Sequence, residues 1–328
     1  MMTLRGARLV AAVVPLVLTA AACAGAAADV RDSVVGGSAA AGDSPGTGAR
    51  ADTAVLRVDW VGGFVTPEML ATRLPIVAVY PDGRVMSEGP QTLTYPGPAL
   101  PNIQLRRISA ADVRKLVDRA AAAGVGAEQD FGQPPVADAP STRFTLRTAA
   151  GVEMQVEALF EADGHGLTAQ QQSARRAAQE LFTALTDLPT ALGPGAVSES
   201  ESYIPAAVAA IASPWVGDCS SPSEAAVPSG SGLPSGGTAP SGTDVPCGGG
   251  TAGTERVWPG PALPGEPVGG GVDLSCVTAS GEEATNLLAA ARTAVTTTRW
   301  TSDGRQWRVA FRPLLPGESG CADLRAAG

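Results

Sequence analysis

The sequence contains few residue patterns that could perform catalysis. His165, in EADGHGLTA, is the single histidine, so a Ser-His-Asp arrangement would have to use it as general base. Its flanking glycines predict a turn, which is a poor place to hold an imidazole ring in a fixed position. Ser44 is the centre of GDSPG, but the strand and helix that flank a nucleophile elbow are not predicted around it. A hydrolase that depends on His165 is therefore the least favoured function.

Other reactive side chains are better explained as surface or structural groups. Glu153 and Glu157 lie at strand spacing on a polar face, whereas a glycosidase needs two carboxylates that face a cleft. The lone histidine and the absence of a Cys-x2-Cys pair argue against zinc. The sequence also has no phosphate loop, dinucleotide fingerprint or EF-hand. We therefore expect no catalytic residue, no metal and no cofactor.

The five cysteines carry the clearest chemistry. Disulfides persist in oxidising compartments, so several cysteines fit an exported protein. Cys219, Cys247, Cys276 and Cys321 can pair in three ways if Cys23 has a different role. We prefer Cys219–Cys247 with Cys276–Cys321, because the first would close a linker and the second would tie a strand to the C-terminus.

Residues 1–22 have the pattern of a secretory signal. Arg5 and Arg8 precede an apolar run over 9–18, and small residues lead directly to Cys23. The run is shorter than the roughly 20 apolar residues that a membrane span needs. Its ending resembles the lipobox of bacterial lipoproteins, although Ala20 stands where that motif usually has Leu or Val. The resemblance implies that Cys23 receives diacylglycerol and becomes the N-terminus; the alternative is an ordinary cleaved signal with an incidental cysteine.

A lipid anchor on Cys23 would place the rest of the chain on the extracytoplasmic face of the cell membrane. The acyl chains that the resemblance implies suffice for stable anchoring. Residues 23–51 are small and polar without an apolar period, which predicts a flexible tether of ~30 Å. The formal charge is −9, and loss of 1–22 makes it more negative, which disfavours nucleic acid as a partner. The expected partners are the membrane, through the lipid, and an unknown envelope protein or cell-wall component.

The remaining sequence divides into two α+β modules and a linker. Residues 52–216 form the first module, in which AVLRVDW places Leu56, Val58 and Trp60 on one face of a strand. Residues 217–256 are rich in Ser, Gly and Pro, which is typical of a disordered linker. Residues 257–328 form a small module that a disulfide would stabilise. The predicted fold is α+β, with antiparallel hairpins packed on helices.

Local signals predict the elements of each module. In the first they give strands or hairpins at 54–60, 75–86, 102–108, 144–158 and 203–215, and helices that begin at Ser109 and Thr168. In the second they give a strand at 272–278, a helix capped by Ser280 with Glu283, and a hairpin around Asp303-Gly304.

A repeated peptide, YPGPALP at 95–101 and WPGPALP at 258–264, precedes the same β-α-β-β order in both modules. This repetition predicts a duplicated half-domain. Each Pro-Gly pair suits a type II turn in which glycine takes positive φ, with an aromatic ring at one end and a leucine at the other. The peptides are expected to be structural corners, and the alternative is a binding surface. The residues concerned are Tyr95, Pro96, Gly97, Leu100, Trp258, Pro259, Gly260 and Leu263.

The C-terminal module has a second resemblance. LSCVTASG, an Ala-rich helix, DGRQWRVAF and Cys321 are similar to secreted subtilisin-inhibitor-type domains over about 272–321. The resemblance implies a related fold and a protease inhibitor at the cell surface. However, the helix lacks the cysteine that closes that family's first disulfide, and the cysteine-flanked inhibitory loop is missing. The leading expectation is therefore a non-catalytic binding module, with protease inhibition as the alternative.

Overall fold

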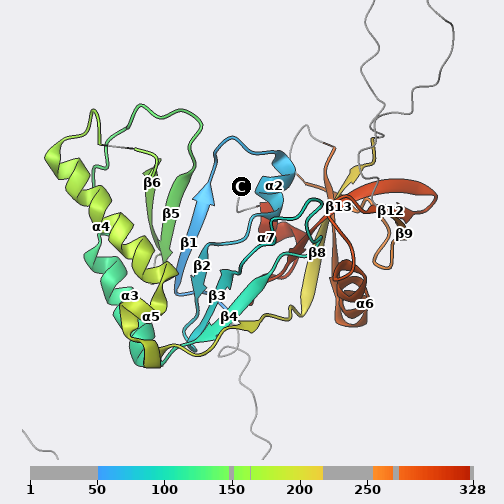
Figure 1. Cartoon of the computed structure of the whole chain (residues 1–328), viewed down its shortest axis with the longest axis horizontal. Helices are drawn as coiled ribbons and strands as arrows, with labels where there is room; N and C mark the ends of the chain where they lie inside the picture. The colour runs from blue at the N-terminus through green and yellow to red at the C-terminus, as the bar shows by residue number, and fades with distance from the viewer. Residues whose placement is uncertain (1–50, 148–150, 163, 217–253, 269–272, 326–328) are drawn as a thin grey trace, which may run out of the picture. The chain divides into compact units, whose positions relative to one another are not determined.

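The computed structural model describes residues 51–147, 151–162, 164–216, 254–268 and 273–325, all within one unit, Ser44–Gly328. These residues form two sheets that pack against helices, so the predicted α+β class is confirmed (Figure 1). The predicted signal (1–22), almost all of the tether (23–51) and most of the linker (217–256) lie outside the described residues.

The first sheet has seven strands in the order β6-β5-β1-β2-β3-β4-β7, and each neighbouring pair is antiparallel. Its strands are β1 (Leu56–Val61), β2 (Val77–Val79), β3 (Arg84–Glu88), β4 (Ile103–Arg107), β5 (Ser141–Leu146), β6 (Val152–Glu157) and β7 (Glu201–Ser202). The predicted hairpin at Asp82-Gly83 joins β2 to β3. Gly83 has φ +90°, and a Cβ there would lie 2.1 Å from the carbonyl oxygen of Ile108, so only glycine fits this turn.

Helices α3 (Ala110–Ala122), α4 (Ala169–Thr186) and α5 (Leu188–Leu192) pack against one face of this sheet; α3 and α4 were predicted from their apolar stripes, whereas α5 was not predicted as a separate helix. The caps are also confirmed. Ser109 Oγ accepts a hydrogen bond from the Asp112 amide, and Thr168 forms a complete capping box with Gln171. Two shorter elements, α2 (Pro67–Thr72) and the 3-10 helix η1 (Pro194–Ala196), complete this part of the chain.

The second sheet has six strands in the order β10-β11-β8-β13-β12-β9. Its strands are β8 (Ala207–Pro214), β9 (Glu255–Val257), β10 (Glu266–Pro267), β11 (Ser275–Ser280), β12 (Arg299–Ser302) and β13 (Arg305–Pro313). Helix α6 (Gly281–Ala291) packs on one face and α7 (Cys321–Arg325) on the other. The predicted turn at Asp303-Gly304 joins β12 to β13. Ser280 is the N-cap residue of α6, as predicted, but its side chain makes no capping hydrogen bond.

The predicted boundary at residue 216 does not separate the two sheets. Strand β8 was expected to end the first module, but it pairs with β11 and β13 inside the second sheet. Both faces of this strand are buried, and a strand of that kind needs neighbours on both sides. Strand β9 (Glu255–Val257) likewise brings Glu255 and Arg256, at the end of the predicted linker 217–256, into the second sheet.

The predicted duplication is not confirmed. The β-α-β-β order does follow both peptides, as β4-α3-β5-β6 and β11-α6-β12-β13, although strand β10 (Glu266–Pro267) lies between the second peptide and β11. In the first sheet the earlier hairpin strand, β5, lies next to β1, and β6 lies at the edge. In the second sheet the later hairpin strand, β13, lies next to β8, and β12 lies outside it. The halves therefore share an element order but not a topology.

Candidate functional site

The second repeated peptide is a structural corner. The Trp258 side chain is only 7% exposed, and its Nε1 donates to the Pro261 carbonyl at 2.6 Å. Its ring lies 5.5 Å from that of Trp300 and 6.1 Å from that of Phe311. The Leu263 side chain is buried in the same cluster, whereas Pro259 is exposed. This peptide therefore anchors the core between the second sheet and α6.

The first repeated peptide lies in a different setting, within the loop between β3 and β4. The Tyr95 side chain is 84% exposed, although its counterpart Trp258 is buried. Gly97 O accepts a hydrogen bond from Thr296 N at 2.9 Å, and Leu100 packs against the core of the second sheet. Pro96 beside Tyr95 is half-buried. This peptide therefore connects a loop of the first sheet to the second.

The predicted type II turns are wrong. Neither Gly97 nor Gly260 has positive φ. A Cβ on Gly260 would lie 3.1 Å from the Trp258 ring, so a larger residue there would make a tight contact with the ring, and no left-handed turn is involved. Both peptides nevertheless contact the same core.

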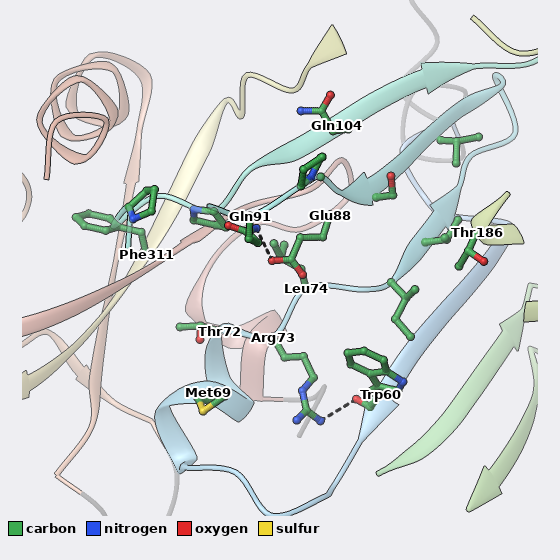
Figure 2. Close-up of a pocket in the computed structure, with 18 of the residues that line it drawn as sticks. Trp60, Met69, Thr72, Arg73, Leu74, Glu88, Gln91, Gln104, Thr186 and Phe311 are labelled. Carbon is green, nitrogen blue, oxygen red and sulfur yellow. Dashed lines mark hydrogen bonds between the residues drawn. The ribbon is translucent and has the colours of Figure 1, made fainter. Parts of the chain in front are cut away.

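One candidate site is a groove of about 1110 Å³ that the sequence did not reveal. It is lined by α2, the end of β1, the β3–β4 loop, the junction of α4 and α5, and β13 (Figure 2). Trp60, which was expected to lie on the same strand face as Leu56 and Val58, lines this groove and is 47% exposed. Met69 is a second exposed apolar side chain in the lining. The strand alternation placed Trp60 on the correct face but gave no sign that this end of the face is open.

Hydrogen bonds order the walls of the groove. Arg73 Nη1 donates to the carbonyl oxygens of Trp60 at 3.1 Å and Gly62 at 3.0 Å, which ties α2 to the end of β1. Burial lowers the pKa of Arg73. On the opposite wall, Gln91 Nε2 donates to Glu88 Oε1 at 2.8 Å (Figure 2). The groove thus combines an exposed indole with ordered polar groups.

A row of side chains continues this wall along β4. Ser200 Oγ donates to Gln104 Oε1 at 2.6 Å, and Gln104 Nε2 donates to Asn102 Oδ1 at 2.5 Å. Asn102 Nδ2 in turn donates to the Pro90 carbonyl at 3.0 Å. These bonds fix the orientation of the amides before any ligand arrives, which lowers the entropy cost of binding.

A smaller pocket of about 250 Å³ is charged. Arg312, which is 1% exposed, lies with its guanidinium 2.8 Å from Glu318, and Arg57 lies 2.8 Å from Asp59. Burial lowers the pKa of Arg312. Burial opposes the charge of Arg57 as well, but Asp59 and then Glu318 raise its pKa. These opposite charges pair with one another, which indicates a structural link between β1 and the end of β13.

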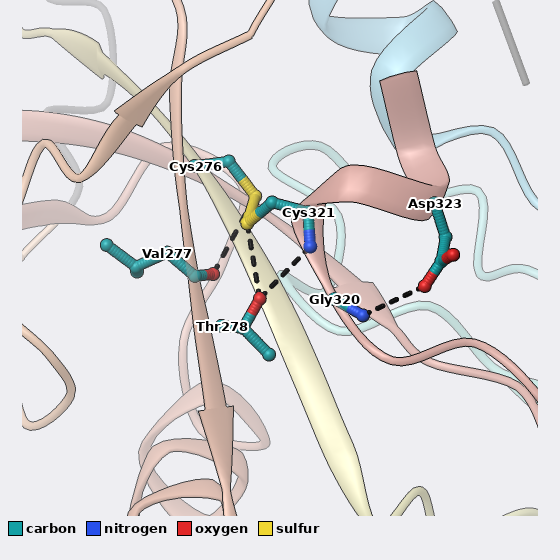
Figure 3. The surroundings of a disulfide bond; sticks show 6 residues. All are labelled: Cys276, Val277, Thr278, Gly320, Cys321 and Asp323. Atoms are coloured by element: carbon teal, nitrogen blue, oxygen red, sulfur yellow. Dashed lines mark hydrogen bonds between the residues drawn. A yellow bond between two sulfur atoms is a disulfide. The ribbon is translucent and has the colours of Figure 1, made fainter. Parts of the chain in front are cut away.

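The predicted disulfide Cys276–Cys321 is present, with a Cα–Cα distance of 5.9 Å (Figure 3). It joins β11 to the start of α7, where Thr278 Oγ1 also accepts a hydrogen bond from Cys321 N at 3.1 Å. The predicted lipidation site Cys23 and the predicted pair Cys219–Cys247 lie outside the described residues.

The residues considered for catalysis are not brought together. His165 is exposed in the turn before α4 and lines neither the groove nor the charged pocket. Ser44 lies outside the described residues. Glu153 lines the charged pocket, where Thr145 Oγ1 donates to it at 3.3 Å, while Glu157 is exposed elsewhere on β6. Within the described ranges, no cluster of His, Cys, Asp and Glu is arranged to hold a metal ion.

The sequence matches no protein-family model, and no curated protein or solved structure shows significant similarity to it. None of the described helices has the length and apolar character to cross a bilayer.

Proposed function

We propose that this chain is a lipid-anchored extracytoplasmic protein that binds an extended, hydroxyl-rich chain of the cell wall, such as a glycan, without transforming it. The observation that carries the proposal is the groove, whose lining combines the exposed Trp60 indole with the hydrogen-bonded side chains of Gln104 and Ser200. An exposed ring offers an apolar face to a sugar, and fixed amides offer donors and acceptors to its hydroxyls.

The charged groups of the groove support a binding role rather than catalysis. Arg73 is held by two carbonyl oxygens, and Glu88 accepts a hydrogen bond from Gln91. Asp187 accepts a hydrogen bond from the amide of Thr190 at 3.3 Å and so caps α5. Glu68 and Arg106 complete the charged lining and have opposite charges, so the groove offers little net charge to an ionic ligand.

The proposed location rests on the lipobox-like start and on the Cys276–Cys321 disulfide, which requires an oxidising compartment to persist. Growth with labelled palmitate should label the wild-type protein, which should then sediment with membranes. The Cys23→Ser variant should be unlabelled and soluble. An unlabelled wild-type protein in the medium would refute the anchor.

Binding can be tested by co-sedimentation of the purified full-length Cys23→Ser protein with insoluble cell-wall glycan. Trp60→Ala should weaken binding by about tenfold, because it removes the aromatic face. Phe64→Ala is the matched control, since Phe64 is an exposed aromatic residue just after β1 but does not line the groove. If Trp60→Ala and Phe64→Ala bind the glycan equally, or if the wild-type protein does not bind it, the groove is not the binding site.

Protease inhibition at the cell surface is the alternative proposal. It is supported by the disulfide between Cys276 and Cys321, the two cysteines in the region similar to subtilisin-inhibitor-type domains. A titration of subtilisin should then show stoichiometric inhibition at micromolar protein. Full protease activity throughout the titration would remove this alternative.

A further inference from the structure

The floor of the groove is one face of the first sheet. Trp60 lies two residues after Val58, which is paired with Val77. Val77 is paired in turn with Ser87, and Ser87 with Gln104. Paired residues, and residues two apart on a strand, point to the same side of a sheet. The order of the strands therefore gives the position of each of these side chains across the groove.

The polarity of this floor changes with the strand order. The floor is apolar at β1 and β2, mixed at β3 and polar at β4, in the order Trp60, Val77, Val85, Ser87, Gln104 and Arg106. Strands β1 and β4 are three strand spacings apart, or about 14 Å. Figure 2 shows Trp60 and Met69 at one end of the groove and Gln104 at the other. The groove therefore has an apolar end and a polar end.

The apolar end leaves two large side chains in contact with solvent. Trp60 and Met69 are 47% and 54% exposed, and the half-buried Val65 lies beside them in the lining. Glu68 and Arg73 also line this end, where Arg73 is held by two backbone carbonyl oxygens. Burial of these apolar side chains by an apolar ligand group is favourable, whereas the hydroxyls of a sugar gain nothing from Met69.

The polar end suits a sugar. The Gln104 side chain accepts a hydrogen bond from Ser200 and donates one to Asn102, which fixes its orientation. Amides and hydroxyls that are ordered in this way match the donors and acceptors of sugar hydroxyls. Because the charges of the groove nearly balance, a neutral sugar fits this end better than an ionic headgroup.

We propose that the ligand of the groove is an amphiphilic glycan, in which a sugar is joined to an alkyl or acyl chain. The chain lies over the end of β1 and α2, and the sugar lies over β4. This proposal rests on the proposed function, because it names the class of ligand that the same groove binds. An acylated glycan of the cell wall and a lipid-linked glycan of the membrane share this chemistry.

The test uses the full-length Cys23→Ser protein and calorimetry with hexyl maltoside and octyl maltoside below their micelle-forming concentrations. Octyl maltoside should bind about tenfold more tightly, because each further buried CH₂ group is worth about fourfold and an open groove covers two such groups incompletely. Tetraethylene glycol monooctyl ether carries the same chain without a sugar. It should bind about tenfold more weakly than octyl maltoside, because it lacks the sugar hydroxyls.

Variants at the two ends separate the contributions of chain and sugar. Met69→Glu should reduce the preference for octyl over hexyl maltoside to about twofold or less, because it places a charge beside the chain. Leu93→Glu is the matched control, since Leu93 is exposed but does not line the groove, and it should keep the preference. Both residues are exposed, so both variants should keep the wild-type thermal midpoint. Gln104→Ala should weaken octyl maltoside by about fivefold, the loss of one hydrogen bond, and leave the octyl ether unchanged.

The source of the chain is tested with insoluble cell-wall glycan before and after mild alkaline removal of ester-linked acyl groups. Weaker co-sedimentation after this treatment assigns the chain to an acylated glycan of the wall. Unchanged co-sedimentation, together with tighter binding of octyl than of hexyl maltoside, assigns it to a lipid-linked glycan.

Three outcomes would overturn the proposal. One is equal affinity for hexyl and octyl maltoside; co-sedimentation with cell-wall glycan would then still support the proposed function by itself. Another is an octyl ether that binds as tightly as octyl maltoside, because the polar end would then not recognise the sugar. The third is an equal loss of chain preference in Leu93→Glu and Met69→Glu. If the wild type bound neither the maltosides nor the cell-wall glycan, the proposed function would be refuted as well.

Discussion

The ion pair between Glu318 and Arg312 is the most informative place to perturb this fold. The Arg312 side chain is almost fully buried and lies 2.8 Å from Glu318 Oε1. The second carboxylate oxygen accepts a hydrogen bond from Leu315 N at 2.8 Å, and Arg57 lies 3.6 Å away. Glu318→Gln keeps the shape of the side chain but leaves the buried guanidinium of Arg312 without its counter-charge.

The expected loss is about 3 kcal/mol of unfolding free energy. Removal of one partner from a buried pair costs about 3–5 kcal/mol, and the lower figure applies because Glu318 keeps some contact with solvent. Lys115→Gln is the control, since Lys115 pairs with Asp112 at the same distance of 2.8 Å but is 66% exposed. It should cost less than about 1 kcal/mol.

Urea denaturation followed by circular dichroism measures both values. The double variant Arg312→Met, Glu318→Leu completes the experiment, because replacement of both charges by apolar groups should cost less than Glu318→Gln alone. If Glu318→Gln loses no more unfolding free energy than Lys115→Gln, then the pair does not stabilise the fold by compensating the buried charge of Arg312.

Three further predictions concern stability. Replacement of Cys276 and Cys321 by alanine should lower the unfolding free energy by about 4 kcal/mol, because the disulfide closes a loop with a sequence separation of 45. A denaturation curve that coincides with that of the wild type would contradict this prediction. Trp258→Ala should cost about 3–5 kcal/mol as a core truncation and Tyr95→Ala less than about 0.5 kcal/mol, so similar losses in thermal denaturation would contradict the unlike settings of the two peptides. Backbone amides that donate to Asp323 hold its pKa below the ordinary value. The ionised Asp323 side chain therefore contributes its full stabilisation above the unfolded-state pKa of about 3.9, and this stabilisation is lost as pH falls through the lower folded-state pKa. Asp323→Asn cannot lose this contribution, so its unfolding free energy should fall less in acid than that of the wild type.

Local chemistry was predictable from the sequence wherever neighbouring residues decide it. The caps at Ser109 and Thr168, the turn at Asp82-Gly83 and the apolar stripes of α3 and α4 depend on residues a few positions apart. The Cys276–Cys321 pairing was chosen from three alternatives by the positions of its cysteines, and the structure contains it.

The repeated peptide shows where local reasoning fails. Six identical residues follow Tyr95 and Trp258, yet one aromatic ring is exposed and the other is buried. The difference comes from residues distant in sequence, since Trp300 and Phe311 surround Trp258 whereas the other peptide borders a segment of the opposite sheet. A sequence pattern gives each residue's chemistry but not its surroundings.

The sequence by itself determined the α+β class and most of the strands and helices, because each depends on composition or on short-range spacing. Only the tertiary structure decided that β8 belongs to the second sheet, that the end of β1 opens into a groove, and that the guanidinium groups of Arg299 and Arg308 both lie over the Trp215 ring. Alternation along a strand tells which side chains share a face, but the neighbours of that strand, and what covers the face, depend on contacts between distant residues.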